Sequence, residues 1–351
     1  MVTDLVLKAF IAIAPVVVLL LVFDRLDVFN LIPMRDIALL VLAGCALALI
    51  TFILNWRVMD GFPIGSSSYS RYVAPVIEET MKALPIALLF ARNRLGFKLD
   101  AAIAGFAVGA GFSMLENAWY LFTLTNTNVS DWLVRGLGTA VMHGAATALF
   151  AIVSHEMSER QSAGLAAHYR FQPLLFLPGL AVAMVVHSVF NHFPDQPLAT
   201  MALTFVLAPL TLFLALARSE RATNQWLASD AASHRQLLDD IRAGRFGQSQ
   251  FASVPAVGAI PAAEIQTYVE LKLELVLRAE ELILASQQGS AVAARGDERE
   301  KFERLDAMEL RFGKAIVAAI GSRIGFTRND LYELDRFRIR LVAAKAAAAG
   351  E

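Results

Sequence analysis

Cysteine is almost absent from the sequence, since Cys45 is the single cysteine among 351 residues. A secreted scaffold held together by disulfides is therefore excluded, because such a framework needs paired cysteines. Charged residues are also scarce, at 18% against about a quarter in a typical soluble protein. Neither sign of charge is in excess, because 31 basic residues face 32 acidic ones, so the sequence predicts no nucleic-acid partner.

The few charges are distributed unevenly along the chain. Residues 1–217 hold 12 Lys and Arg and 13 Asp and Glu, whereas the shorter remainder, residues 218–351, holds 19 of each sign. The first part is too apolar for a water-soluble domain, and the second has an ordinary soluble composition. The sequence therefore predicts an all-α fold, with a polytopic helical membrane domain at residues 1–217 and a small soluble helical region after it.

Long apolar runs divide residues 1–217 into about seven candidate membrane-spanning helices, because a span needs about 20 mostly apolar residues. The third and fourth runs contain the most polar residues. The first run is interpreted as a retained span and not as a signal peptide, because Asp24-Arg25-Leu26-Asp27 follows it instead of a cleavage site. The predicted spans cover residues 5–23, 36–56, 73–91, 100–122, 135–154, 174–193 and 198–217.

Basic residues in the loops predict the orientation of these spans. With the C-terminus in the cytoplasm, nine basic residues fall on the inner side and four on the outer side. The sequence therefore predicts that the N-terminus is outside and the C-terminus inside. No transit peptide or organellar signal is recognised, so the lipid bilayer of a bacterial cytoplasmic membrane is the expected setting.

Ionisable side chains inside the predicted spans are the main indication of function, because each costs about 2.5–3.5 kcal/mol to insert. Acids and imidazoles from four different spans lie about 9–12 Å from the outer ends of their helices, and so they share one layer. Polar residues placed at random would scatter in depth. The candidate site residues are Glu78, Glu79, Lys82, Glu116, His143, His187 and Asn191.

Helical spacing places several of these side chains on shared faces. Lys82 follows Glu78 by four residues and Glu79 by three, so its ammonium group can neutralise either carboxylate. Two further faces have the same spacing and supply supporting residues. They are formed by Phe112, Glu116 and Tyr120 with the adjacent Asn117, and by His187 with Asn191.

Proline and small residues indicate how the helices around this layer pack. Pro75 and Pro85 flank the glutamate pair and predict a distorted third helix. On the next two spans, small residues recur at every fourth position, which lets helix backbones approach closely. These residues are Gly105 and Gly109 on the fourth span and Ala140, Gly144 and Ala148 on the fifth.

In chain order, the motifs resemble those of the PrsW family of intramembrane proteases, which is related to CAAX-processing and bacteriocin-processing membrane proteases. The resemblance covers residues 70–193 and excludes the first two spans and the C-terminal region. It implies an endopeptidase that cleaves a membrane-anchored protein, such as an anti-sigma factor or another single-span regulator, within or near the bilayer. The motifs are Glu78-Glu79-x-x-Lys82, Phe112-x-x-x-Glu116-Asn117-x-x-Tyr120, His143-Gly144 and His187-x-x-x-Asn191.

A glutamate mechanism would need no cofactor. Glu78 or Glu79 would activate the attacking water as a general base. The resemblance to the CAAX-type relatives implies that His187 and Asn191 donate to the oxyanion. His143 would orient the water or protonate the leaving amine.

A metal mechanism is the alternative that the residues also allow. Zinc would be bound by His143, His187 and Glu116, because two histidines and a carboxylate are a normal catalytic zinc set. Glu78 or Glu79 would then be the base. The sequence itself leaves the two mechanisms open.

Other functional classes were weighed against proteolysis. Buried acids and histidines in one layer are also typical of a proton-coupled transporter. A transporter predicts inverted repeats, and the sequence holds no second Glu-Glu pair or matching repeat. A catalytically silent membrane adaptor, in which the same charges form structural ion pairs, is the third alternative.

The C-terminal region is predicted to be regulatory or partner-binding. Residues 218–262 are interpreted as a loosely ordered linker, because glycines and prolines interrupt them. Residues 263–351 form a soluble domain, with amphipathic helices expected at 263–286, 298–320 and 328–348. These helices carry no nucleophile or metal motif in the sequence, and they are a candidate surface for a homo-oligomer.

Overall fold

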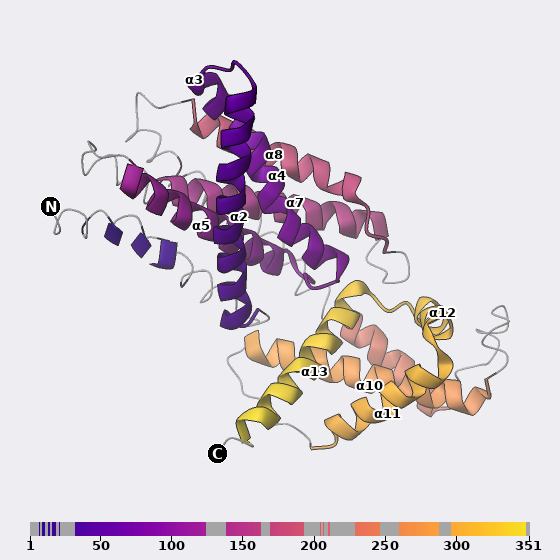
Figure 1. The fold of residues 1–351 in the computed structure, drawn as a ribbon. Helices are drawn as coiled ribbons and strands as arrows, with labels where there is room; N and C mark the ends of the chain where they lie inside the picture. Colours follow the sequence, from indigo (N-terminus) through magenta and orange to yellow (C-terminus); the bar gives the residue numbers. More distant parts are fainter. Residues whose placement is uncertain are drawn as a thin grey trace. The chain divides into compact units, whose positions relative to one another are not determined.

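A computed structural model of the chain describes residues 32–123, 138–162, 169–192, 229–245, 260–287 and 296–348, with isolated positions between 7 and 21 and between 204 and 210. Throughout these residues, every regular element is helical, which confirms the predicted all-α class (Figure 1). The chain divides into two compact units. The first contains residues 1–158 and 171–219, and the second contains residues 159–170 and 220–351.

Five of the seven predicted spans fall on helices of the first unit: α2 (Met34–Gly61), α4 (Ala74–Ala91), α5 (Lys98–Thr123), α7 (Ala140–Ser162) and α8 (Leu177–Phe190), the last preceded by the 3₁₀ turn η4 (Pro173–Phe176). The predicted spans at 5–23 and 198–217 lie outside the described residues, apart from isolated positions. Helix α7 extends eight residues beyond the predicted end of its span at 154.

The count of seven spans is not confirmed. Among the described residues, three helical segments are long and apolar enough to cross a membrane, namely Met34–Gly61, Lys98–Thr123 and Pro173–Phe190. Helix α4 is not among them, because Glu78, Glu79 and Lys82 interrupt its apolar sequence. Helix α7 is also excluded, because its last two turns, from Ser154 onward, are mostly polar.

Helix α5 forms the centre of the first unit, and its N-terminal two thirds are buried on all sides. It packs against α2 and α4, and glycines bring its backbone close to α2 and α7. A Cβ atom at Gly111 would overlap the backbone of Val41, and one at Gly109 would overlap the carbonyl of His143. The predicted close approach of the fourth and fifth spans is therefore present, and it fixes the height of His143 relative to α5.

A short π-helical turn, η1 (Tyr69–Val73), precedes α4, and Pro75 explains part of its geometry. Proline has no N–H group, so the carbonyl of Arg71, four residues earlier, has no helical donor. The N–H of Ala74 bonds to the carbonyl of Tyr69, five residues back, which leaves the carbonyl of Ser70 unused as well. The turn therefore presents two backbone acceptors.

Helix α8 uses both acceptors. The hydroxyl of Ser188 donates to the carbonyl of Arg71 at 2.7 Å, and Nδ2 of Asn191 donates to the carbonyl of Ser70 at 2.8 Å. These bonds attach the end of α8 to the start of α4. The two helices that carry His187 and the glutamate pair are consequently held side by side.

The second unit is a helical bundle with its own apolar core. It contains a helix at residues 229–242, then α10 (Ala262–Gln287), α11 (Glu298–Phe312), α12 (Lys314–Ile324) and α13 (Arg328–Ala348). The interpretation of residues 218–262 as a loose linker is therefore wrong for 229–242. The glycines and prolines that suggested a linker all follow residue 242, while Leu238 and Ile241 are buried in the core.

The helix predicted at 298–320 is divided into α11 and α12 in the structure. The division lies at Gly313, which has φ 79° and ψ 159°, a backbone conformation that is essentially restricted to glycine. Helix α12 continues through Gly321 and ends at Gly325, which adopts the left-handed conformation typical of a helix C-terminus.

Candidate active site

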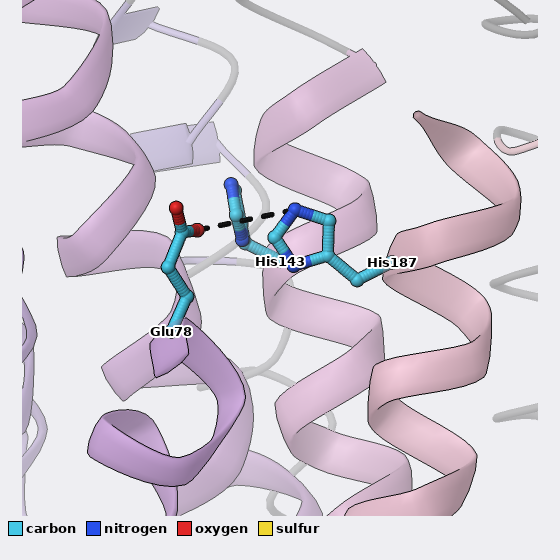
Figure 2. Close-up of side chains that lie close together, drawn as sticks. All are labelled: Glu78, His143 and His187. Carbon is cyan, nitrogen blue, oxygen red and sulfur yellow. Dashed lines mark ion pairs between the residues drawn. The ribbon is translucent and has the colours of Figure 1, made fainter. Parts of the chain in front are cut away.

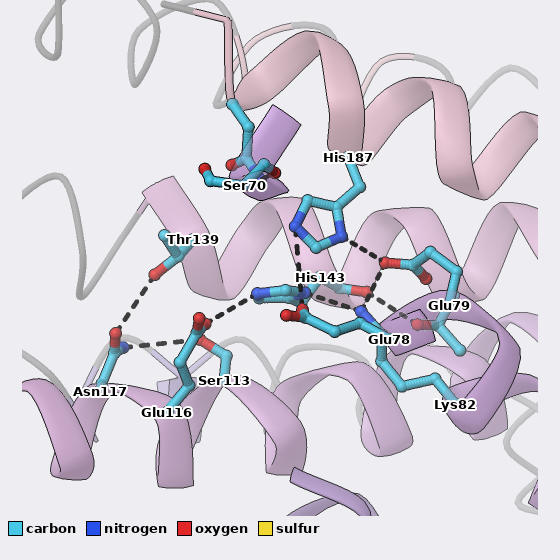
Figure 3. A network of polar contacts seen from close by, with 12 residues as sticks. Ser70, Glu78, Glu79, Lys82, Ser113, Glu116, Asn117, Thr139, His143 and His187 are labelled. Atoms are coloured by element: carbon cyan, nitrogen blue, oxygen red, sulfur yellow. Dashed lines mark hydrogen bonds and ion pairs between the residues drawn. The ribbon is translucent and has the colours of Figure 1, made fainter. Parts of the chain in front are cut away.

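Four helices of the first unit bring the predicted ionisable side chains together (Figure 3). Helix α4 supplies Glu78, Glu79 and Lys82, α5 supplies Glu116, and α7 and α8 supply one histidine each. Burial is almost complete for all of them except Glu116, which is half-buried. The common depth predicted from helix lengths thus corresponds to a real cluster of side chains.

Lys82 lies at the centre of this cluster and is fully buried. Its ammonium group donates to Oε1 of Glu79 at 2.5 Å and to Nδ1 of His143 at 2.7 Å. It also lies 4.7 Å from the centroid of the Phe112 ring, whose electron-rich face attracts a cation. Because an ammonium group can only donate, Nδ1 of His143 accepts, and the ring is neutral with its hydrogen on Nε2.

The other side of His143 faces Glu116. The distance from Nε2 to Oε2 of Glu116 is 2.9 Å, so the imidazole hydrogen is donated to this carboxylate. The Glu116 side chain is 14% exposed, compared with 1% for His143. A continuous chain of polar contacts therefore runs from the buried lysine to the most accessible carboxylate of the cluster.

His187 approaches the same glutamates from α8. Its Nδ1 donates to Oε1 of Glu79 at 2.8 Å. Its Nε2 faces Oε2 of Glu78 at 3.9 Å (Figure 2). Within the described parts of the chain, Oε2 of Glu78 is buried and has no hydrogen-bond partner, which is unusual for a carboxylate 7% exposed.

A metal ion would fit this arrangement. One donor atom each from Glu78, His143 and His187 lie within 4.8 Å of one another, and the unsatisfied oxygen of Glu78 is among the groups that a cation would complete. The carboxylate of Glu79 on Nδ1 of His187 is the partner that metal-binding histidines commonly have. Since both nitrogens of His143 are engaged, coordination by His143 would replace one of its two hydrogen bonds.

The donor set differs from the set predicted from the sequence. The sequence pointed to His143, His187 and Glu116, whereas the structure places Glu78 with the two histidines. Glu116 instead accepts the hydrogen of His143. The reason is that helical spacing identifies residues on one face of a helix, but it does not say which face meets which across neighbouring helices.

Sequence reasoning missed two residues that support Glu78. Nδ2 of Asn55, in the last two turns of α2, donates to Oε1 of Glu78 at 3.2 Å. The hydroxyl of Tyr69 in turn donates to Oδ1 of Asn55 at 2.8 Å. One sequence feature could have identified Asn55, since it is an amide near the end of the most apolar run of the chain, close to the predicted outer surface.

Three further predicted residues lie beside the cluster of acids and histidines. Asn191 donates to the carbonyl of Ser70 and so secures α8, and no contact of its amide with the glutamates is found among the described residues. Asn117 is buried. Its Oδ1 accepts the hydroxyl of Thr139 at 3.3 Å, and its Nδ2 donates to the hydroxyl of Ser113 at 3.5 Å. Tyr120 lies one turn beyond Glu116 on α5 and is half-buried.

Comparisons with known proteins identify the family of the chain. No curated protein and no solved structure matches the chain. The family model of PrsW family intramembrane metalloproteases matches residues 33–217, which is more than half of the chain and includes every residue of the cluster. The chain therefore belongs to the PrsW family of intramembrane proteases.

Proposed function

We propose that this membrane protease hydrolyses a peptide bond of a membrane-anchored protein at the cluster formed by Glu78, His143 and His187. The observation that carries the proposal is the buried Oε2 of Glu78, which has no hydrogen-bond partner among the described residues and faces Nε2 of His187 at 3.9 Å. A buried carboxylate oxygen of this kind is satisfied by a proton, a water or a cation. An attacking water or a bound cation at this oxygen is what a hydrolytic site needs.

The balance of charge favours a divalent cation, and we propose zinc. By formal charge alone, Glu78, Glu79 and Glu116 contribute three negative charges and Lys82 one positive charge. The two negative charges in excess equal the charge of one zinc ion. Glu78, His143 and His187 would hold the ion, which when bound supplies a Lewis acid for the peptide carbonyl.

The remaining side chains position these groups and move protons. Glu79 orients His187 through Nδ1, and Lys82 holds Glu79 in place. Glu116 is the carboxylate closest to the surface, so it is the group best placed to accept a proton from water or deliver one to the leaving amine through His143.

The glutamate mechanism is the second candidate, and a specific observation supports it. Both nitrogens of His143 already have partners, Lys82 and Glu116, and would need no metal to be satisfied. In this mechanism Glu78 takes the proton of the attacking water. The rest of the cluster keeps the positioning roles given above.

The setting of the reaction is proposed from the sequence. Nine basic residues against four favour a cytoplasmic C-terminus and an external N-terminus. About seven spans and a bacterial cytoplasmic membrane are consistent with the apolar runs. The substrate class follows from the family, whose site opens to a protein held in the same bilayer, and a single-span regulator such as an anti-sigma factor is the proposed type.

A co-expressed single-span reporter tests the proposal. Glu78→Gln and His187→Gln should each reduce cleavage by at least about 100-fold, because each removes a reacting or binding group. Thr80→Ala is the matched control on α4, because Thr80 is exposed and donates only to the carbonyl of Val76 in its own helix. The fragments would be quantified by immunoblot after confirming equal amounts of full-length protease in the membrane.

Removing metal with a chelator distinguishes the metal mechanism from the glutamate mechanism. Loss of cleavage with a membrane-permeant chelator, restored by zinc, is expected. Cleavage that survives chelation but is lost in Glu78→Gln would replace the metal mechanism with the glutamate mechanism. Variants that express normally and cleave as the wild type does would overturn the site itself and bring the transporter and adaptor alternatives forward.

A further inference from the structure

A second group of acids and a histidine lies in the helical bundle of the second unit. Asp230 and His234 are four residues apart on the 229–242 helix and therefore share a face. Glu280 comes from α10 and Asp330 from the first turn of α13. One donor atom from each of the four lies within 4.8 Å of all the others.

The histidine is held by one of the acids and faces another. Nδ1 of His234 donates to Oε1 of Glu280 at 2.9 Å. Its Nε2 points to Oδ2 of Asp330 at 3.7 Å, which is too long for a hydrogen bond. It is close to the separation of about 3.3–3.6 Å between two ligands of one tetrahedral zinc ion.

Several oxygens of the group are buried without a hydrogen bond to any residue that the structure describes. They are Oδ1 of Asp330, Oε2 of Glu280 and Oδ2 of Asp230. Asp330 and Glu280 are each 1% exposed. Oδ2 of Asp330 accepts the N–H of Thr327 as part of a capping box at the start of α13, so the orientation of this carboxylate is fixed by the helix.

The charges of the group do not balance. Three carboxylates face one imidazole, and Arg235, a neighbouring cation, is exposed to solvent. A divalent cation bound among these side chains would offset the excess of buried negative charge.

We propose that Asp230, His234, Glu280 and Asp330 form a second metal site, specific for a divalent transition metal such as zinc. An imidazole with carboxylates is a donor set for zinc, manganese or iron, whereas magnesium and calcium prefer oxygen ligands alone. Nε2 of His234 is the ligand nitrogen, because Nδ1 is already bound to Glu280 in the pattern that orients metal-binding histidines.

The site would tie together three helices that are distant in the sequence. The four ligands come from the 229–242 helix, α10 and α13, with about 100 residues between Asp230 and Asp330. An ion that binds only the folded bundle stabilises it, and the gain grows with the logarithm of the ion concentration relative to Kd. The proposed role is therefore structural, and it is independent of peptide hydrolysis.

Amide hydrogen exchange on the full chain in detergent tests the proposal without any substitution. Added zinc should slow exchange at least about tenfold in peptides covering 229–242 and the start of α13, because bound metal reduces local opening. Peptides from α11 that contain no ligand are the internal reference. The chain is first stripped with chelator, and manganese and magnesium are added in parallel arms, with no protection expected from magnesium.

Substitutions test whether zinc binding to the second unit requires the proposed ligands. The test uses a Glu78→Gln, His187→Gln background, which removes ligands of the proposed catalytic site, and measures bound zinc by equilibrium dialysis and mass spectrometry. One zinc per chain should remain in this background and be lost on adding His234→Gln or Asp330→Asn. Glu303→Gln, at an exposed position paired with Arg299, is the control that should retain the ion.

The outcomes are distinguishable. If His234→Gln prevents folding, Asp230→Asn at the less buried edge of the group replaces it, and the exchange measurement on the wild-type chain still stands. Equal zinc content in the background with and without the cluster substitutions, together with no protection of 229–242 by zinc, would overturn the proposal. The group would then be a structural cluster of a histidine and protonated acids.

Discussion

At the residue scale, Lys82 has two buried partners at once. Its ammonium group donates to Glu79 and to His143, and through them it influences both histidines of the site. A lysine with no exposed surface is costly to bury, and it is stable here because its hydrogen bonds and the Phe112 ring replace water. The position of this one charge sets the tautomer of His143.

Replacing this lysine should damage both stability and activity. Lys82→Met leaves the buried carboxylate of Glu79 without its cation, and breaking such a pair from one side costs about 3–5 kcal/mol. Thermal unfolding in detergent should show this loss, and reporter cleavage should disappear. The double variant Lys82→Met, Glu79→Gln should recover much of the stability and none of the cleavage. Recovery of cleavage in the double variant would contradict the positioning role of both residues.

Asn55 and Tyr69 act on Glu78 in series, since Tyr69 bonds to Asn55 and Asn55 bonds to Glu78. Asn55→Leu should lower kcat about tenfold to 100-fold with little change in KM, because a hydrogen bond to a charged group contributes about 1.5–3 kcal/mol. Tyr69→Phe should have a smaller effect. In the double variant the two effects should not add, and a purely additive result would show that Tyr69 acts elsewhere.

At the element scale, the close contact of α5 with α7 determines where His143 lies. The backbone of α7 passes so near to Gly109 that a Cβ atom there would overlap the carbonyl of His143. The π-helical turn η1 has a comparable role for α4 and α8, since its two unused carbonyls receive Ser188 and Asn191. The site thus depends on helix backbones as much as on side chains.

A methyl group at Gly109 should move α5 away from α7. Gly109→Ala is expected to destabilise the first unit by about 1–3 kcal/mol and to reduce cleavage, because overpacked interfaces must shift. Gly61→Ala at the end of α2 is the matched control, since nothing lies within 4 Å of its added Cβ atom. Equal thermal stability and cleavage of the two variants would contradict the close contact.

Much of the first unit could be predicted at this scale, and the reason is physical. Apolar runs must be buried or face lipid, so they located α2, α4, α5 and α8 to within a few residues of their ends. The ionisable residues of the site were conspicuous against those runs. Their partners were not predictable, because Glu78 and Glu116 each lie near His143 for reasons of helix packing that spacing along one helix does not contain.

The second unit was harder to predict, because it has no long apolar runs against which ionisable residues are conspicuous. Polar residues are common throughout a soluble helical bundle, so they do not mark a site there. The 229–242 helix was missed because the glycines that follow it suggested a linker. The group around His234 has no recognisable spacing motif in the sequence. Asp230 and His234 are close in the sequence, but Glu280 and Asp330 join them only through the packing of α10 and α13. Sites assembled from distant helices require the structure.

At the scale of the whole molecule, the proposed orientation places the C-terminus in the cytoplasm. Fusions after residue 351 test this directly. A fluorescent protein that folds in the cytoplasm should be bright, and an alkaline phosphatase fusion that needs export should be inactive. The reverse pattern would invert the topology, because one span more or fewer changes the side of the C-terminus.

The charge balance of the site also predicts which substrate residues can lie beside the scissile bond. A site whose formal charges cancel on binding a divalent ion offers a charged residue no compensation for its lost hydration. Small or apolar residues should therefore flank the scissile bond, and a helix of the substrate should have to unwind before it is cut. Placing Lys or Asp beside the cleavage point should block cutting or move it, and mass spectrometry of the fragments would locate the new end.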